Sequence, residues 1–133
     1  MSLLIKASGE ADLTFVIDGG GVPIETGQKG HLRVPFGCAI DRVTLLADTD
    51  GSIQVDIWRS TLDDFPPSNS DSITGGNEPH ISSGNSYEDS DLEDWDKALN
   101  EGDILAFNVD SVGGGEGGGT INRVTVSLRV RKN

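Results

Sequence analysis

Six segments of the sequence alternate apolar and polar residues with a period of two, the pattern of β-strands that bury one face. They are residues 13–17, 30–34, 40–47, 52–59, 104–109 and 121–130. The last is the clearest, since its apolar residues share one face: Val124, Val126, Leu128 and Val130. A chain of 133 residues is long enough for one domain with its own core. The alternation therefore predicts a single antiparallel β domain rather than a helical bundle.

Turn residues between the segments refine this fold. The run Asp48-Thr49-Asp50-Gly51 is typical of a tight turn and predicts a hairpin joining 40–47 to 52–59. The apolar phase slips by one residue between Ile40 and Val43, which indicates a β-bulge. Two further short edge strands are candidates, at 72–74 and 80–82. Together these features predict an all-β antiparallel β-sandwich, most specifically a jelly roll with Greek-key crossovers.

Acidic charge is concentrated in one part of the chain. The formal net charge is −12, and residues 63–103 contain 12 acids and one base, a local balance of −11. We therefore expect a β-sandwich domain over 13–133 whose scaffold, outside residues 63–103, is nearly neutral. It would carry an acidic, loop-rich insertion at 61–101 that faces solvent.

One short helix is expected within that insertion, over residues 91–99. Ser90-Asp91-Leu92-Glu93 matches a capping box, the pairing of side chains that begins many helices. Leu92, Trp95 and Leu99 follow at a spacing that places them on one helical face.

Charge and composition exclude several classes of partner. A net charge of −12 repels a phosphate backbone, so we expect no nucleic-acid partner. The sequence has no run of 18 apolar residues and no basic region followed by an apolar one at its start. We therefore expect neither a membrane span nor a conventional signal peptide. The single cysteine, Cys38, excludes an internal disulfide framework, and its apolar neighbours predict a buried side chain.

No motif in the sequence predicts catalysis. The glycine run 113–118 contains G-x-G-x-x-G but leads into a β-branched strand, so it predicts a loop and not a nucleotide site. Asp48-x-Asp50-Gly51 lacks the later ligands of a calcium loop. His31, in an expected strand, and His80, at an expected edge, are each predicted to be surface or edge side chains rather than catalytic bases. We predict no enzyme activity, catalytic residue, cofactor or resident metal. Weak divalent-cation binding is left open for one acidic cluster: Glu88, Asp89, Asp91, Glu93, Asp94 and Asp96.

The N-terminal segment Met1-Ser2-Leu3-Leu4-Ile5-Lys6 is apolar at its centre and allows two interpretations. It is either the first edge strand of the domain's own sheet or part of an N-terminal arm over residues 1–12. Such an arm adds to a neighbour's sheet edge or packs on another subunit. On the second interpretation, Leu3, Leu4 and Ile5 are the partner-binding residues.

Several longer motifs extend along most of the chain. They are Phe15-x-Ile17-Asp18-Gly19-Gly20-Gly21, Gly30-x-Leu32-x-Val34-Pro35-Phe36, Gly51-Ser52-Ile53-x-Val55-Asp56-Ile57-Trp58 and Gly102-Asp103-Ile104-Leu105-Ala106-Phe107-Asn108-Val109-Asp110-Ser111. In combination they resemble a β domain found in tailed-bacteriophage virion proteins, over roughly residues 13–132. The resemblance implies a β domain with a structural role in the virion.

In such virion proteins the domain often ends a longer tail or fibre polypeptide, whereas only about a dozen residues precede it here. This favours a capsid decoration (cement) protein that stabilises the head surface and is made in the bacterial host cytoplasm. Its expected partners are the major capsid protein and copies of itself, as a homotrimer. The alternative is a tail-fibre tip or receptor-binding module for host surface glycans, and a third interpretation is a free-standing carbohydrate-binding β-sandwich. Trp58, expected to face outward, and Tyr87 are the candidate sugar platforms.

Overall fold

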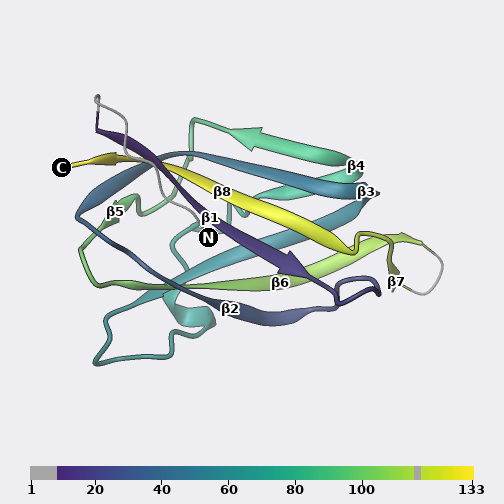
Figure 1. Cartoon of the computed structure of the whole chain (residues 1–133), viewed down its shortest axis with the longest axis horizontal. Coiled ribbons are helices and arrows are strands. Elements are labelled where there is room, and N and C mark those ends of the chain that lie inside the picture. Colours follow the sequence, from purple (N-terminus) through teal and green to yellow (C-terminus); the bar gives the residue numbers. More distant parts are fainter. Residues whose placement is uncertain (1–8, 116–117) are drawn as a thin grey trace.

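The computed structural model describes residues 9–115 and 118–133 as an all-β fold, one antiparallel sheet strongly curled into a half-barrel (Figure 1). The elements in chain order are β1 (Glu10–Asp18), β2 (Gly27–Arg33), β3 (Cys38–Ser60), the 3-10 helix η1 (Asn69–Asp71), β4 (His80–Asp89), β5 (Ala98–Leu99), β6 (Ile104–Gly115), β7 (Gly118–Gly119) and β8 (Arg123–Lys132). The strand order is β1-β8-β3-β6-β2, with β4 and β5 paired to β3 and β7 paired to β6. The all-β, antiparallel part of the sequence prediction is therefore confirmed.

Strand β3 organises the sheet, because its two halves have different partners. Residues 38–47 pair with β8, residues 52–60 pair with β6, and β4 pairs with both halves. Figure 1 shows β3 turning back along the long axis of the molecule near its middle. The predicted turn at Asp48–Gly51 falls in the middle of this strand, but the predicted hairpin is wrong, since the two halves do not pair with each other. The β-bulge is confirmed, because the ladder with β8 shifts between Ile40 and Arg42.

The apolar faces predicted from the alternation form the core. Phe107 of β6 is completely buried and stacks on Phe15 of β1, with ring centroids 4.5 Å apart and ring planes within 6°. Gly30 of β2 faces the same ring, and a Cβ atom there would lie 2.6 Å from Cζ of Phe15. Strands β1 and β2, which lie at the two ends of the strand order, thus meet at this stack. β2 can approach it because position 30 is glycine.

The helix predicted over 91–99 is wrong. Leu92 and Asp94 have φ angles of +48° and +70°, which a right-handed helix excludes. The chain instead turns around Asp89, whose Oδ1 accepts hydrogen bonds from the backbone N–H groups of Asp91 and Leu92. Leu92, Trp95 and Leu99 are buried all the same, so their spacing reflects contact with the core and not a helical period.

Helices have a minor part in the described fold. Within residues 9–115 and 118–133, η1 is the only helix, and none is long and apolar enough to cross a membrane.

The acidic segment 61–101 forms part of the sheet and of the core. It supplies β5 and the ten residues of β4, which pairs with β3. The predicted strand at 80–82 is the start of β4, whereas 72–74 makes only a single bridge, between Ser72 and Trp58. Five apolar residues of the segment are buried: Ile73, Ile81, Leu92, Trp95 and Leu99. The loop-rich description of this segment therefore underestimates its contribution to packing.

The N-terminal residues Leu3, Leu4 and Ile5 lie outside the described residues. Strand β1 begins at Glu10 and pairs with β8 from its first residue, Glu10 opposite Arg131. The described part of the proposed arm, up to Asp12, is consequently an edge strand of the sheet.

Candidate functional site

The residues singled out from the sequence as reactive groups have structural positions. His31 and His80 are exposed, as predicted. Cys38 is 1% exposed, and burial, with a smaller effect from the charge of Asp103, raises the pKa of its thiol to about 11. At neutral pH the thiol is therefore protonated and unreactive, and the prediction of a buried Cys38 is confirmed.

The two aromatic residues proposed as sugar platforms are both partly covered. Trp58 is half-buried, and its indole N–H donates a hydrogen bond to Oδ2 of Asp56 at 3.0 Å. Tyr87 packs against the core, and its ring centroid lies 4.8 Å from that of His80.

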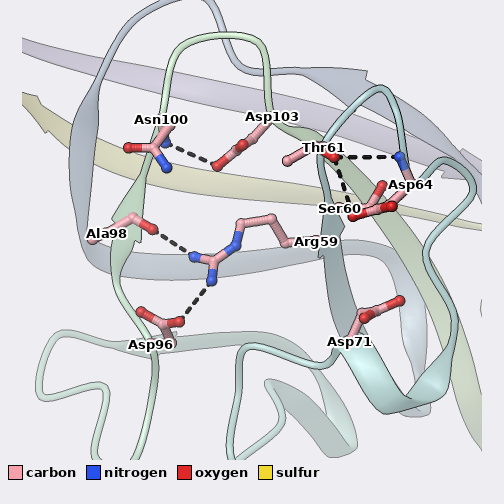
Figure 2. A pocket seen from close by; sticks show the side chains of 9 residues that line it. All are labelled: Arg59, Ser60, Thr61, Asp64, Asp71, Asp96, Ala98, Asn100 and Asp103. Carbon is pink, nitrogen blue, oxygen red and sulfur yellow. Dashed lines mark hydrogen bonds and ion pairs between the residues drawn. The ribbon is translucent and has the colours of Figure 1, made fainter.

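A polar hollow of about 410 Å³ lies beside the end of β3 (Figure 2). Arg59 crosses it, and its guanidinium donates to Oδ2 of Asp96 at 2.7 Å and to the carbonyl of Ala98. The backbone N–H of Asn100 donates to Oδ2 of Asp103 at 2.9 Å. The lining also includes Asp64, Asp71 and two hydroxyl residues, Ser60 and Thr61. Groups of this kind suit a ligand rich in hydroxyl groups.

An apolar groove of about 500 Å³ lies between the two ends of the curled sheet. It is lined by three residues of β1 and three of β2: Thr14, Phe15, Val16, His31, Leu32 and Arg33. In the described fold β1 pairs only with β8, and β2 pairs only with β6. Each strand therefore has one edge whose backbone groups are unpaired along this groove, an arrangement that natural sheets commonly cover.

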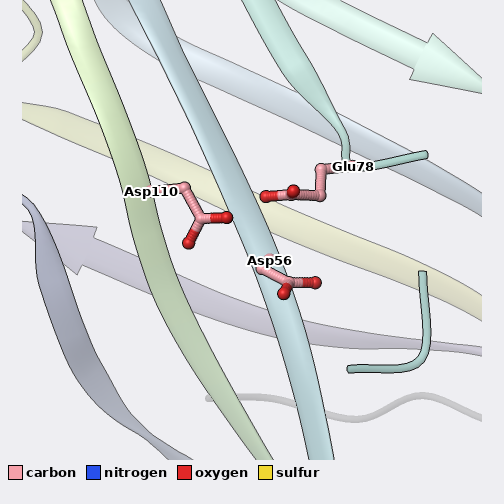
Figure 3. Close-up of side chains that lie close together, drawn as sticks. All are labelled: Asp56, Glu78 and Asp110. Carbon is pink, nitrogen blue, oxygen red and sulfur yellow. The ribbon is translucent and has the colours of Figure 1, made fainter. Parts of the chain in front are cut away.

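Three carboxylates from distant parts of the sequence form a cluster that sequence reasoning missed (Figure 3). Asp56 lies on β3 and Asp110 on β6, where the ladder between the two strands shifts at Gln54 and Val55. Glu78 comes from the connection that precedes β4. One oxygen of each lies within 4.8 Å of the others. Among the described residues no such group includes any of the six acids at 88–96, which do not converge.

Asp56 is held by four hydrogen bonds and is only 3% exposed. Its Oδ1 accepts from the backbone N–H of Ile57 at 2.8 Å, from the Ser72 hydroxyl at 2.7 Å and from the Thr74 hydroxyl at 2.9 Å. Its Oδ2 accepts from Trp58. The alternation placed Asp56 on the outer face of its strand, but the segment around Ser72 and Thr74 covers that face. Asp56 therefore fastens this segment to the sheet.

Glu78 is the member of the cluster whose ionisation is altered. Its Oε1 is buried and has no hydrogen-bond partner among the described residues. Burial, then the adjacent Asp110 carboxyl and the charge of Asp56, raises the pKa of Glu78 from 4.5 to about 8. Glu78 is consequently protonated at neutral pH, because burial and then the neighbouring Asp110 and Asp56 carboxyls disfavour its ionised form.

The chemistry of the cluster favours a proton on Glu78 over a bound cation. Calcium takes six to eight oxygen ligands, whereas this cluster offers three carboxylates. The oxygens of Asp56 already accept four hydrogen bonds. A proton on Glu78 removes its repulsion with Asp56 and Asp110 without requiring further ligands.

This assignment predicts a pH-dependent stability. The folded state holds the Glu78 proton more tightly than the unfolded chain, so the free energy of unfolding falls as the pH rises from 4.5 to about 8. Because the side chain is partly exposed, we expect a decrease of roughly 1–2 kcal/mol over this range. Urea unfolding at several pH values measures it. Glu78→Gln should remove this component, and Glu25→Gln, at an exposed position, should keep it. An unchanged slope in Glu78→Gln would contradict the assignment.

Comparison with known proteins assigns the chain to no family. No protein-family model matches the chain, and a search of curated proteins found no similar sequence. Inference about function therefore depends on the residues and on the geometry of the groove, the hollow and the carboxylate cluster.

Proposed function

We propose that this chain is a non-enzymatic structural protein of a tailed-bacteriophage virion, and that it acts as a capsid decoration protein stabilising the head shell. The observation that supports this most is the apolar groove with an unpaired strand edge on each side. Free edges beside an apolar surface are suited to assembly with other chains. On this proposal the partners are the major capsid protein and copies of this chain, as a homotrimer on the virion surface.

Several residues of the motifs that resemble phage virion domains occupy positions that hold this fold together. At Gly19 a Cβ atom would lie 2.0 Å from the carbonyl oxygen of Val22, so this turn needs glycine. Phe107 stacks on Phe15, and Gly30 lies against the ring of Phe15, as described above. Asp56 fastens the segment that covers β3. A chain that keeps these residues keeps the packing of the domain.

We further propose that the curled sheet belongs to the jelly-roll type of β-sandwich. The two halves of β3 pair with different strands, β8 and β6, after the chain turns back between them. The stacking of Phe15 on Phe107 joins side chains of β1 and β6, which do not pair with each other in the strand order. Both features fit two facing layers that share one bent strand.

The hydrogen bonds of Asp56 support a structural role for that carboxylate. Asp56 is saturated with hydrogen bonds from its own domain, and Glu78 is neutral at pH 7. The acids of the outer surface include Asp63, Asp91 and Glu93, which are exposed. On a particle, such acids would face solvent.

Fractionation of the virion tests the proposal. When purified particles are separated into heads and tails, the chain is expected in the head fraction, and mass spectrometry of both fractions identifies it. Finding the chain in tails alone would reject decoration and favour the alternative below.

The second candidate function, a tail-fibre tip or receptor-binding module, is favoured by the polar hollow at Arg59. Its acids and hydroxyl groups could bind the hydroxyls of a host glycan. Under this alternative, Asp64→Ala and Asp71→Ala should weaken glycan binding to purified protein, and Glu25→Ala, outside the hollow, should not.

A further inference from the structure

Strands β1 and β2 approach each other across the groove without pairing. Gly30 of β2 lies against the ring of Phe15 on β1, yet the two strands share no ladder in the described fold. Within residues 9–115 and 118–133, each strand pairs along one edge only. The position between two unpaired edges is suited to an added strand, which would gain backbone hydrogen bonds on entering.

The surface of the groove favours an apolar strand. Leu32 is buried at its base, Phe15 is partly buried, and Val16 is 49% exposed although it is a large apolar side chain. The charged lining residue is Arg33, with the exposed His31 next to Leu32. A strand with apolar side chains on both faces would cover Phe15 and Leu32 inside and Val16 outside.

The chain itself contains a segment of this character. Leu3, Leu4 and Ile5 are consecutive apolar residues, so a strand would direct Leu3 and Ile5 to one face and Leu4 to the other. Eight residues precede Gly9, and fully extended they span roughly 26 Å. Three residues of each edge strand line the groove, a length of about 10 Å. The segment is thus long enough to leave one copy and cover the groove of another.

We propose that the groove between β1 and β2 receives residues 1–6 of a second copy of this chain. This inference rests on the proposed function, in which copies of this chain associate as a homotrimer. Strand exchange would join copies through backbone hydrogen bonds and would remove the free edges of both strands. Gly9 has a φ of +82°, which would also permit the segment to fold back on its own β1. The experiment therefore has to distinguish the two donors.

Disulfide trapping between full-length copies makes this distinction. One copy carries Leu3→Cys, and a second copy with a different tag carries Thr14→Cys, in the groove. The native Cys38 is buried with a raised pKa, so it does not compete. We expect a disulfide between the two tagged copies after mild oxidation. The matched control replaces Thr14→Cys by Ser70→Cys, an exposed position in η1, and should give no linked dimer.

A single chain with both Leu3→Cys and Thr14→Cys tests the other donor. If its disulfide forms within the chain at all protein concentrations, the segment covers its own groove and the proposal is overturned. No disulfide in any mixture would also overturn it. Head-and-tail fractionation separates this failure from that of the proposed function. If the chain is found in heads but no disulfide forms, strand exchange is rejected and decoration is retained. If the disulfide-linked dimer forms but the chain is absent from particles, decoration alone is rejected.

Discussion

Replacing Asp56 with alanine is expected to lower the free energy of unfolding by about 3–5 kcal/mol. The substitution removes the acceptor of four hydrogen bonds at a position that is 3% exposed. The hydroxyls of Ser72 and Thr74 and the indole N–H of Trp58 would lose this partner. The segment around Ser72 should then separate from β3, and urea unfolding monitored by tryptophan fluorescence measures the loss.

The control for this prediction is Asp110→Ala in the same cluster. Asp110 is exposed and accepts a side-chain hydrogen bond from Asn108. Its removal takes a negative charge away from Glu78, so we expect a change below about 1 kcal/mol. The account of Asp56 would be contradicted if Asp56→Ala were no more destabilising than this control.

Phe107→Ala is the second substitution with a large expected effect, a loss of about 3–5 kcal/mol. Phe107 is completely buried at the centre of the sheet, and its ring stacks on that of Phe15. Truncation leaves a cavity below the ring of Phe15, which also loses its stacking partner. Thermal and urea unfolding measure the effect.

Phe65→Ala is the matched control for the aromatic stack, because Phe65 is 43% exposed and its ring meets only that of His31 edge-on among the described aromatic pairs. We expect a loss below about 1 kcal/mol, as for most surface positions. Equal losses in the two variants would show that the stack is not the centre of the core.

The strands were predictable from the sequence because their alternation is strong, as in β8 with its four buried apolar residues. The bulge at Ile40 was predictable for the same reason. Strand β4 was predictable only at its start, 80–82, because it is polar along most of its length and buries only Ile81. The false helix arose from Leu92, Trp95 and Leu99, whose spacing matches a helix although a turn with positive φ places them in the core.

The carboxylate cluster could not be predicted from sequence. Asp56, Glu78 and Asp110 come from three separate elements, and their proximity depends on the β3–β6 ladder and on the segment that covers it. The alternation of β3 assigns Asp56 to the outer face of the strand. This was the only sequence signal for Asp56, and it predicted an exposed side chain. The groove likewise depends on the curl that brings β1 near β2, a property of the whole sheet and not of either strand.

The number of copies of this chain in a purified virion distinguishes a head decoration protein from a tail protein. A decoration protein covers a repeating head lattice, so the account predicts hundreds of copies per particle. Quantitative mass spectrometry against the major capsid protein gives the count. A few copies or about a dozen would contradict decoration and would place the chain in the tail.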